Sequence, residues 1–270
     1  MRFKIKLGRD TGNTYIPVDY QYFIGAWVYK VLAKADKQLA SFLHSFGYGE
    51  GNKRFKFFSY SPLDIRPYTF HKEKGLFELN GNEVNFQLAF NLDNLAENFI
   101  KGIFTDQEVF IGDKINGAHF RVAGIEALPS PSFNETTRYS IKSPLVISMK
   151  NENNKATYLA PDDKKYNEYF INHLVEKYKG YLVSMPVKAG NFNEDDEPMW
   201  DFRIRSNFRS GLRVMRPGTA EETRVKGYIY EFELTAPVEI HRMGYNCGFG
   251  EKNAMGFGWV EIKNDKKTKI

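Results

Sequence analysis

The stretch Gly248-Phe-Gly-Glu-Lys-Asn-Ala-Met-Gly-Phe-Gly258 places two Gly-Phe-Gly triplets on either side of a polar pentapeptide. Glycine lacks a Cβ and tolerates positive φ, so such a loop can bring backbone close to a ligand and let amide N–H groups converge on an anion. The phenylalanines would anchor the loop from beneath. Neither G-x-G-x-x-G nor G-x-x-x-x-G-K-S/T occurs in the stretch, so we expect a phosphate chain as ligand and no nucleotide cofactor.

The composition around this loop limits the class of protein. The 270 residues, 42% of them hydrophobic, exceed a typical domain of ~100–150 residues and favour two modest domains. The single cysteine, Cys247, excludes an internal disulfide framework, and the N-terminus lacks a secretory signal, so we expect a cytoplasmic protein. No apolar run approaches the ~20 residues of a membrane span. A net charge of +5 only mildly favours an anionic partner.

Hydrophobic periodicity in the first half predicts alternating strands and helices. Residues 1–7 alternate, with Arg2, Lys4 and Lys6 on one basic face. Further strands are predicted at 55–60, 84–90 and 118–128. Helices are predicted at 20–31, capped by Asp19, at 36–46 and at 92–100, ended by Gly102. The order β-α-β-β-α-β predicts an α+β, ferredoxin-like (RRM-like) domain.

The prolines and polar residues between 129 and 137 predict a boundary, with one domain at 1–130 and a second at 131–270. The second half predicts a helix at 166–178, ended by Gly180, and no second helix. Its strands are predicted at 139–149, 181–187, 202–206 and 228–234. We therefore expect two tandem ferredoxin-like domains, the second a degenerate copy that carries the C-terminal glycine-rich loop.

Two such domains ending in G-h-G-x5-G-h-G, where h is apolar, resemble the repeat-associated RNA-binding proteins of CRISPR systems. Within that superfamily the chain resembles the CRISPR-associated endoribonuclease that cuts repeat transcripts into guide RNAs. The resemblance covers most of the chain and rests on the glycine loop, with support from the opening strand, residues 40–45, residues 56–61, Ser143-Pro144-Leu145 and Gly244-Tyr245.

The resemblance implies RNA cleavage without a metal. The RNA's own 2′-hydroxyl would attack the adjacent phosphate, leaving a 2′,3′-cyclic phosphate and a 5′-hydroxyl. The sequence has no H-E-x-x-H and no Cys-x-x-Cys, so we expect no metal site. The acidic run at 194–197 is better explained as a solvated loop than as a Mg²⁺ site.

His44 is the candidate for moving protons. On a helical wheel it lies away from the stripe of Leu39, Phe42, Leu43 and Phe46, so its imidazole should reach solvent or a ligand. It also lies in the last helical turn, where the helix dipole favours imidazolium, as a general acid requires. An ordinary surface histidine is the competing interpretation from position alone, whereas the family places a catalytic histidine here.

Tyr29 and Lys56 complete the candidate catalytic set. Tyr29 lies opposite the apolar face of its helix and could hold a phosphate or orient the nucleophile, although a tyrosine without a role fits equally well. Lys56 matches the lysine with which the family stabilises transition-state charge. Lys53 or Arg54 could reach the same phosphate, and that choice stays open.

Binding should involve more of the surface than cleavage. Seven cations within 24 residues favour a phosphate track: Arg203, Arg205, Arg209, Arg213, Arg216, Arg224 and Lys226. Arg203 and Arg205 share one strand face. At the glycine loop we predict RNA contacts from Gly248, Gly250, Lys252, Asn253, Gly256 and Gly258. His71, His119, His173 and His241 are interpreted as structural.

The expected partner is CRISPR repeat RNA, and the resemblance also allows effector-complex subunits and either a monomer or a homodimer. A protein of this fold that grips repeat RNA without cutting it is the main alternative. A protein-binding scaffold is a third hypothesis, and it would lack the steep salt dependence of a protein that neutralises several phosphates.

Overall fold

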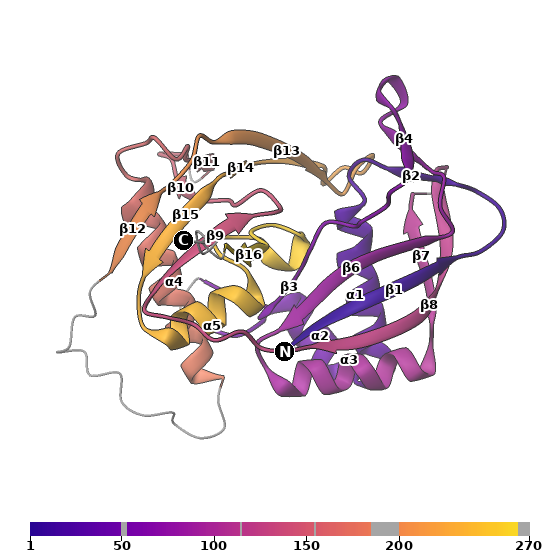
Figure 1. The fold of residues 1–270 in the computed structure, drawn as a ribbon, viewed down its shortest axis with the longest axis horizontal. Helices are drawn as coiled ribbons and strands as arrows, with labels where there is room; N and C mark the ends of the chain where they lie inside the picture. The colour runs from indigo at the N-terminus through magenta and orange to yellow at the C-terminus, as the bar shows by residue number, and fades with distance from the viewer. Residues whose placement is uncertain (50–52, 114, 154, 185–199, 264–270) are drawn as a thin grey trace, which may run out of the picture.

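The computed structural model describes residues 1–49, 53–113, 115–153, 155–184 and 200–263. It has a mixed α/β fold with antiparallel sheets, and the two largest are built from residues 2–128 and from residues 136–262. The two halves lie beside each other, with the N-terminus at their junction (Figure 1). No helix in the described ranges is both long and apolar enough to cross a membrane.

The first half is built on a five-stranded sheet of order β3-β6-β1-β8-β7. Its strands are β1 (Arg2–Arg9), β3 (Phe58–Tyr60), β6 (Glu83–Phe90), β7 (Glu108–Gly112) and β8 (Gly117–Leu128). The central strand β1 pairs with β6 on one side and β8 on the other, so that Ile5 lies opposite Phe86 and Ile125. Phe3, Ile5 and Leu7 of β1 are buried, as the period-two pattern predicted.

The first half also contains three helices, α1 (Gln21–Ala35), α2 (Lys37–Ser45) and α3 (Asp93–Thr105). The predicted cap of α1 is wrong, because Tyr20 occupies that position without a side-chain hydrogen bond. Asp19 instead accepts a hydrogen bond from the backbone of Val214, 195 residues away. Asp36 caps α2 by accepting from Leu39 N at 2.9 Å, and Gly47 follows the helix with φ 76°.

The predicted apolar stripe of α2 is wrong in its direction. Ala40 and Leu43 are buried, whereas Phe42 and Phe46 are 39% and 63% exposed. Because successive helical residues are 100° apart, the buried face is rotated toward the side that carries His44. Burial therefore places His44 at the edge of the packed face.

Gly102 does not end α3 but lies inside it. A Cβ at this position would lie 2.0 Å from the carbonyl oxygen of Val31, so only glycine lets α3 approach α1 this closely. The helix continues to Thr105. Gly180 likewise lies inside its helix, where a Cβ would lie 2.9 Å from the ring of Phe55. In both cases the glycine marks close packing rather than a helix end.

Short elements that the periodicity did not reveal complete the first half. Besides β7, they form a three-stranded sheet of β2 (Tyr15–Pro17), β5 (Leu76–Leu79) and β4 (Tyr68–His71), with the 3₁₀ turn Lys72–Lys74. The strand predicted at 55–60 begins only at Phe58, because Phe57 has a φ of 51°.

The second half is built on a four-stranded sheet of order β12-β15-β9-β16. Its elements are β9 (Thr136–Ile141), α4 (Tyr166–Val183), β12 (Asp201–Ile204), β15 (Glu231–Thr235), α5 (Val238–Cys247) and β16 (Val260–Ile262). The expectation of a single helix is wrong, since α5 packs with α4. The strand predicted at 181–187 is also wrong where it is described, because Tyr181, Leu182 and Val183 belong to α4.

Two hairpins extend this half. The predicted strand 139–149 is broken at Ser143-Pro144, and its end forms β10 (Ser148–Lys150), which pairs with β11 (Ala156–Tyr158). The predicted strand 228–234 is divided at Tyr230 between β15 and β14 (Thr223–Ile229). Strand β14 pairs with β13 (Arg209–Met215), and this ribbon runs across toward the first half (Figure 1).

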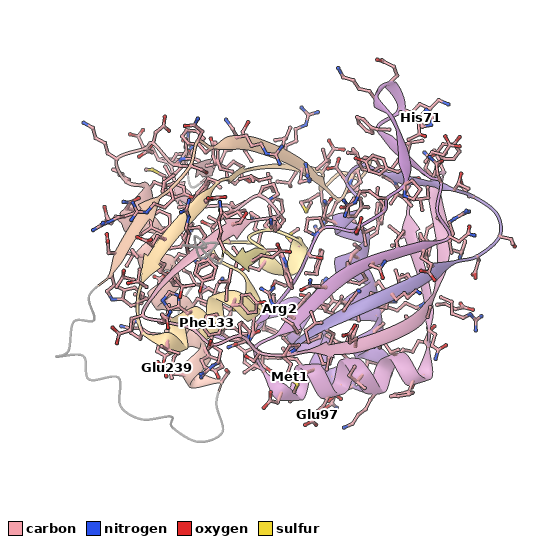
Figure 2. The ribbon with its side chains drawn as sticks, in the orientation of Figure 1. Met1, Arg2, His71, Glu97, Phe133 and Glu239 are labelled. Carbon is pink, nitrogen blue, oxygen red and sulfur yellow. The ribbon has the colours of Figure 1, made fainter. Side chains whose placement is uncertain are left out.

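Arg2 joins the two halves. Its guanidinium lies 3.2 Å from the ring centroid of Tyr245 and 3.9 Å from that of Trp259, and it donates to the carbonyl of Val260 at 3.1 Å. Figure 2 shows it at the junction. The residue is 96% buried, and burial lowers its pKa to about 9. Of the basic face predicted for this strand, Lys4 and Lys6 are exposed, whereas Arg2 is not. Cation–π contacts and carbonyl acceptors offset the loss of water.

The contact of Gly102 with Val31 predicts that Gly102→Ala destabilises the fold. Alanine normally favours a helix over glycine, but here the added methyl must push α3 from α1, which should lower the free energy of unfolding by about 1–3 kcal/mol or more. Urea denaturation would measure this. The exposed neighbour provides the control, Lys101→Ala, which should unfold within about 0.5 kcal/mol of wild type. Equal midpoints for both variants would contradict the argument.

Candidate active site and RNA interface

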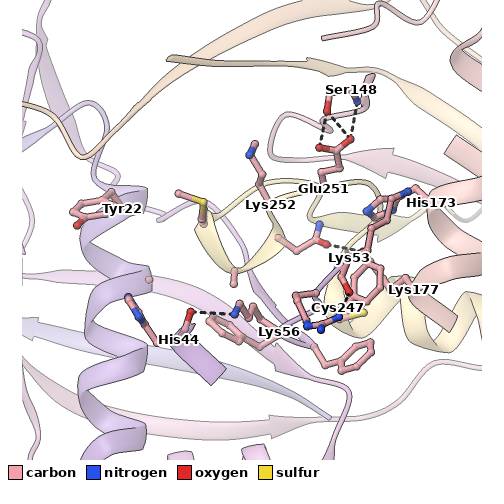
Figure 3. A pocket seen from close by; sticks show the side chains of 18 of the residues that line it. Tyr22, His44, Lys53, Lys56, Ser148, His173, Lys177, Cys247, Glu251 and Lys252 are labelled. Carbon is pink, nitrogen blue, oxygen red and sulfur yellow. Dashed lines mark hydrogen bonds between the residues drawn. The ribbon is translucent and has the colours of Figure 1, made fainter. Parts of the chain in front are cut away.

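A cavity of about 830 Å³ lies between the two halves of the chain. From the first half it is lined by α1, the end of α2 and residues 53–58, and from the second half by β10, α4 and the glycine loop. Figure 3 shows His44 and Lys56 toward one end and Ser148 and Glu251 toward the other. Neither half encloses the cavity alone.

The glycine loop adopts the backbone that its sequence predicted. Gly248, Gly250, Gly256 and Gly258 have φ values of 80°, 67°, 86° and 70°. A Cβ on Gly258 would lie 1.9 Å from the carbonyl oxygen of Phe249, so the two triplets touch through bare backbone. Both phenylalanines are buried, Phe249 completely and Phe257 to 99%, and anchor the loop as expected.

The amides of the loop do not converge on a ligand as expected. Phe249 N donates to the carbonyl of Gly258 at 3.0 Å, Glu251 N to that of Val146 at 2.9 Å, and Gly258 N to that of Pro144 at 3.0 Å. The first of these bonds closes the loop on itself, and the other two tie it to the segment that contains Pro144 and Val146. The loop therefore presents side chains, and the expectation of an anion-binding nest is wrong for these three amides.

Of the two predicted contact residues in the loop centre, only Lys252 is exposed. Asn253 turns inward: its amide nitrogen donates to the carbonyls of Phe249 and Phe257, both at 3.0 Å. Its side-chain oxygen accepts from Lys177 at 2.6 Å. Asn253 therefore holds the loop together: both protons of its amide nitrogen are used inside the loop, and its side-chain oxygen keeps one acceptor position. The RNA contact of Asn253 stays a prediction.

Lys177 of α4 lies beneath the loop. Its Nζ donates to the carbonyls of Gly248 and Gly250, both at 2.9 Å, as well as to Asn253. The residue is 98% buried, and burial lowers its pKa from 10.5 to about 8. An ammonium has three donors, and all three are satisfied by loop oxygens. Lys177 thus fixes the loop to α4.

The opposite side of the loop touches α1. A Cβ on Gly25 would lie 3.0 Å from the carbonyl oxygen of Ala254, and one on Gly256 would lie 2.9 Å from the ring of Tyr60. Tyr60 in turn donates to the carbonyl of Gln21 at 2.7 Å. Because residue 25 is a glycine, the loop can lie directly on α1. Tyr29 lies on the same helix, one turn after Gly25.

His44 and Tyr29 meet at this end of the cavity. Their ring centroids are 5.4 Å apart in an edge-to-face arrangement, and Tyr29 also packs edge-on against Phe58. His44 is exposed at the end of α2, as predicted. Burial raises the pKa of Tyr29 far above its usual value, so the phenol keeps its proton and can donate a hydrogen bond.

Lys56 lies beside His44. Its Nζ donates to the backbone carbonyl of His44 at 3.1 Å, and burial together with the charge of Arg54 lowers its pKa. Lys53 and Arg54 line the same cavity, but Lys53 forms an ion pair with Glu176 of α4, and Arg54 donates to the carbonyl of Lys53. Lys56 therefore directly contacts the backbone of His44.

The described lining of the cavity is strongly cationic. It contains one carboxylate, Glu251, and seven lysines and arginines: Lys53, Arg54, Lys56, Lys150, Lys177, Arg216 and Lys252. Glu251 accepts from the backbone N and the hydroxyl of Ser148 at 2.7 and 3.0 Å. Such a lining favours a polyanion over a neutral ligand.

The remaining histidines have mixed positions. His241 Nδ1 bonds the Tyr139 hydroxyl at 2.8 Å, and its Nε2 donates to the carbonyl of Glu135 at 2.9 Å, as in a structural residue. His71 contacts Glu78 at 2.7 Å, and His119 is exposed on β8. His173 is buried but lines the cavity, which its assignment to an apolar stripe did not reveal.

The predicted arginine track does not reach the cavity at Arg203 and Arg205. Arg203 lies in the edge strand β12 and pairs with Asp201 at 2.7 Å. Arg205 directly follows this strand and pairs with Glu233. Arg216, at the end of the β13–β14 ribbon, does line the cavity. The acidic run 194–197 lies outside the described residues, and within those residues no cluster of three His, Cys, Asp or Glu could hold a metal ion.

Comparison with known proteins identifies the same family for both halves. Residues 128–262 match the family described as CRISPR associated protein Cas6, C-terminal, and residues 15–125 match CRISPR-associated protein Cas6, N-terminal. The chain is 29% identical to the CRISPR-associated endoribonuclease Cas6 1 of Methanocaldococcus jannaschii, over 100% of this chain and 97% of that protein.

Two solved structures share the fold. One, a Cas6-related protein from Pyrococcus furiosus, has a TM-score of 0.77 and 24% identity, covering 98% of this chain and 99% of the other. The second, described as an RAMP protein binding different RNA substrates, has a TM-score of 0.76 and 22% identity, covering 98% and 100%.

The lowered pKa of Lys177 predicts an unusual pH dependence of stability. Between about pH 8 and pH 10.5 the unfolded chain retains the lysine proton that the folded chain has released. The free energy of unfolding of wild type should therefore rise with pH relative to Lys177→Met, by at most about 1.4 kcal/mol per pH unit. Urea titrations at pH 7.5 and 9.5 would measure the difference. Exposed Lys179→Met is the control and should show no such change.

Proposed function

Because the chain belongs to the Cas6 family of CRISPR-associated proteins, we propose that it is an endoribonuclease that cuts CRISPR repeat transcripts into guide RNAs. The observation that carries this proposal is the cavity shared by both halves. It combines His44, Tyr29 and Lys56 with a cationic lining that suits a phosphate backbone.

In the proposed reaction the RNA's 2′-hydroxyl attacks the adjacent phosphorus. The new P–O2′ bond forms as the P–O5′ bond breaks and the proton of the 2′-hydroxyl passes to solvent, leaving a 2′,3′-cyclic phosphate and a 5′-hydroxyl. His44 supplies the proton that the leaving O5′ needs. Its exposure at the cavity edge supports this role, because the imidazole can meet the phosphate without moving the packed face of α2.

Tyr29 and Lys56 act on the same phosphate in this proposal. The Tyr29 phenol stays protonated and packs against the His44 ring, so it can donate a hydrogen bond to a phosphate oxygen next to the general acid. Lys56, held at the His44 carbonyl, supplies the positive charge that stabilises the crowded phosphorane. Neither step calls for a metal ion, so we propose that cleavage proceeds in EDTA.

RNA binding is proposed to extend beyond the cavity. Arg216 and Lys252 line it, and the exposed cations of the β13–β14 ribbon, Arg209, Arg224 and Lys226, continue outward from it. Arg203 and Arg205 would contact RNA only where it passes over the edge strand β12. Neutralising several phosphates makes affinity fall steeply with salt, which a protein-binding scaffold would not show.

We also propose that the halves are tandem ferredoxin-like domains divided near residue 130. In chain order the core of the first half is β1-α1-β3-β6-α3-β8, and that of the second is β9-α4-β12-β15-α5-β16. Both sheets place their four core strands in the order 2-3-1-4. This shared order supports a repeat of one ferredoxin-like unit.

An RNA-binding protein of the same family that does not cut is the alternative. The similar RAMP protein is described by the RNA it binds, which favours keeping this alternative. Tight binding of repeat RNA by wild type, without cleavage in either EDTA or Mg²⁺, would establish it.

Replacing His44 by alanine should slow cleavage about 10²–10⁴-fold and leave RNA binding unchanged, because the imidazole acts on the leaving oxygen. Cleavage of end-labelled repeat RNA in excess EDTA would measure the rate, with a 2′-deoxy substitution at the cut as the test of the nucleophile. His119→Ala, exposed on β8, is the matched control and should cut normally. Equal rates for the two histidine variants would refute the assignment.

Two neighbouring cations, Lys56 and Lys53, should differ in effect. Lys56→Ala should lower the cleavage rate by roughly 10²–10³-fold with little loss of binding, since it removes one stabilising charge at the phosphate. Lys53→Ala should mainly weaken binding and change the rate less, because the charge of Lys53 is already paired with Glu176 rather than directed at the reacting phosphate. Single-turnover rates at saturating protein would separate the two effects. A larger loss of rate for Lys53→Ala would reassign the role.

A further inference from the structure

Glu251 has no role in the reaction proposed above, although it is the one carboxylate in the described cavity lining. It accepts from Ser148 N at 2.7 Å, and the Ser148 hydroxyl lies 3.0 and 2.9 Å from its two oxygens. Placed in an RNA-binding cavity, a carboxylate repels phosphate. The group that binds next to it should therefore be an uncharged hydrogen-bond donor.

The carboxylate keeps free acceptor capacity. Ser148 can give only two protons, one from its amide and one from its hydroxyl, whereas an ionised carboxylate offers about four acceptor positions. About two positions therefore remain for a ligand. Because the Ser148 contacts fix the orientation of the carboxylate, these positions are fixed as well.

His173 supplies a second polar group to the same cavity. It is 92% buried, and its Nδ1 has no hydrogen-bond partner among the described residues. Burial and the charge of Lys177 lower its pKa well below the usual value, so the ring is neutral and offers one donor and one acceptor. An unpaired buried nitrogen is costly, and a ligand that bonds it would remove that cost.

His173 lies on the face of α4 that holds the loop segment next to Glu251. Tyr169, His173 and Lys177 are spaced four residues apart, so they share one face of the helix, and all three line the cavity. Lys177 bonds the carbonyl of Gly250, the residue before Glu251. His173 therefore lies one helical turn from the point at which α4 holds this part of the loop.

Apolar groups complete this end of the cavity. Met149 and Tyr169 are partly buried, and Phe55 packs edge-on against His173 with 5.7 Å between ring centroids. A flat heteroaromatic ring can pack on such groups while its edge meets polar side chains.

We propose that Glu251 and His173 form a nucleobase subsite that selects guanine, an inference that rests on the proposed cleavage of RNA. Guanine presents two adjacent donors, N1–H and N2–H, which match the two remaining acceptor positions of the carboxylate. Uracil flanks its single N–H with carbonyl oxygens, which the carboxylate repels. Figure 3 places Ser148 and Glu251 away from His44, so the selected base belongs to a nucleotide near the cut rather than to the reacting sugar.

The test is an inosine scan of the CRISPR repeat RNA from the source organism, with binding measured in EDTA. Inosine lacks only the N2 amino group of guanine. At one guanosine the replacement should weaken binding to wild type about tenfold, the cost of one hydrogen bond to a charged group. In Glu251→Ala the same replacement should change affinity less than twofold. Both proteins meet the same RNAs, so any change in RNA folding cancels.

Ser148→Ala is the matched control. It removes one bond to the carboxylate but leaves the carboxylate in place, so the sensitivity to inosine should persist. If Glu251→Ala does not fold, Glu251→Gln replaces it and should reduce the sensitivity. Wild type that binds and cuts the repeat yet tolerates inosine at every position overturns the subsite and leaves the nuclease intact. Wild type that does not bind the repeat at all overturns both proposals.

Discussion

The ammonium of Lys177 is the constraint from which the site is built. A buried cation is costly unless its donors are all satisfied, and here three donors meet three oxygens of one loop. Two of these oxygens are carbonyls of glycines with positive φ, a backbone that residues with a Cβ rarely adopt. The loop sequence and the buried lysine therefore require each other, and the loop in turn reaches α1 at Gly25.

Most of the fold could be predicted because its elements are long and regularly patterned. Strands β1, β6 and β8 and helices α1, α3 and α4 all carry strong periodicity. The errors came from residues that serve distant contacts. Gly102 and Gly180 suggested helix ends but serve close packing, and Asp19 suggested a cap but bonds Val214. Local patterns cannot distinguish these uses, because the deciding partner lies far away in the chain.

The catalytic candidates were found through a resemblance, and the geometry then brought Tyr29, His44 and Lys56 to one cavity. The other side of that cavity was missed. Lys177 continues the spacing of Tyr166, Phe170 and His173, and a lysine on an apolar stripe was a signal that it is buried. Glu251 gave no such signal, because its partner Ser148 is 103 residues away.

The contacts by which Arg2 joins the two halves limit how a substrate can enter the cavity. The walls of the cavity come from different halves of the chain, an arrangement that elsewhere often opens about a hinge. Here the guanidinium between Tyr245 and Trp259, with its bond to the Val260 carbonyl, ties the first strand to the second half. Opening would expose and break these contacts. The contacts of Arg2 therefore fix the width of the cavity between the two halves. We expect an RNA strand to enter along the length of the cavity rather than by separation of the halves.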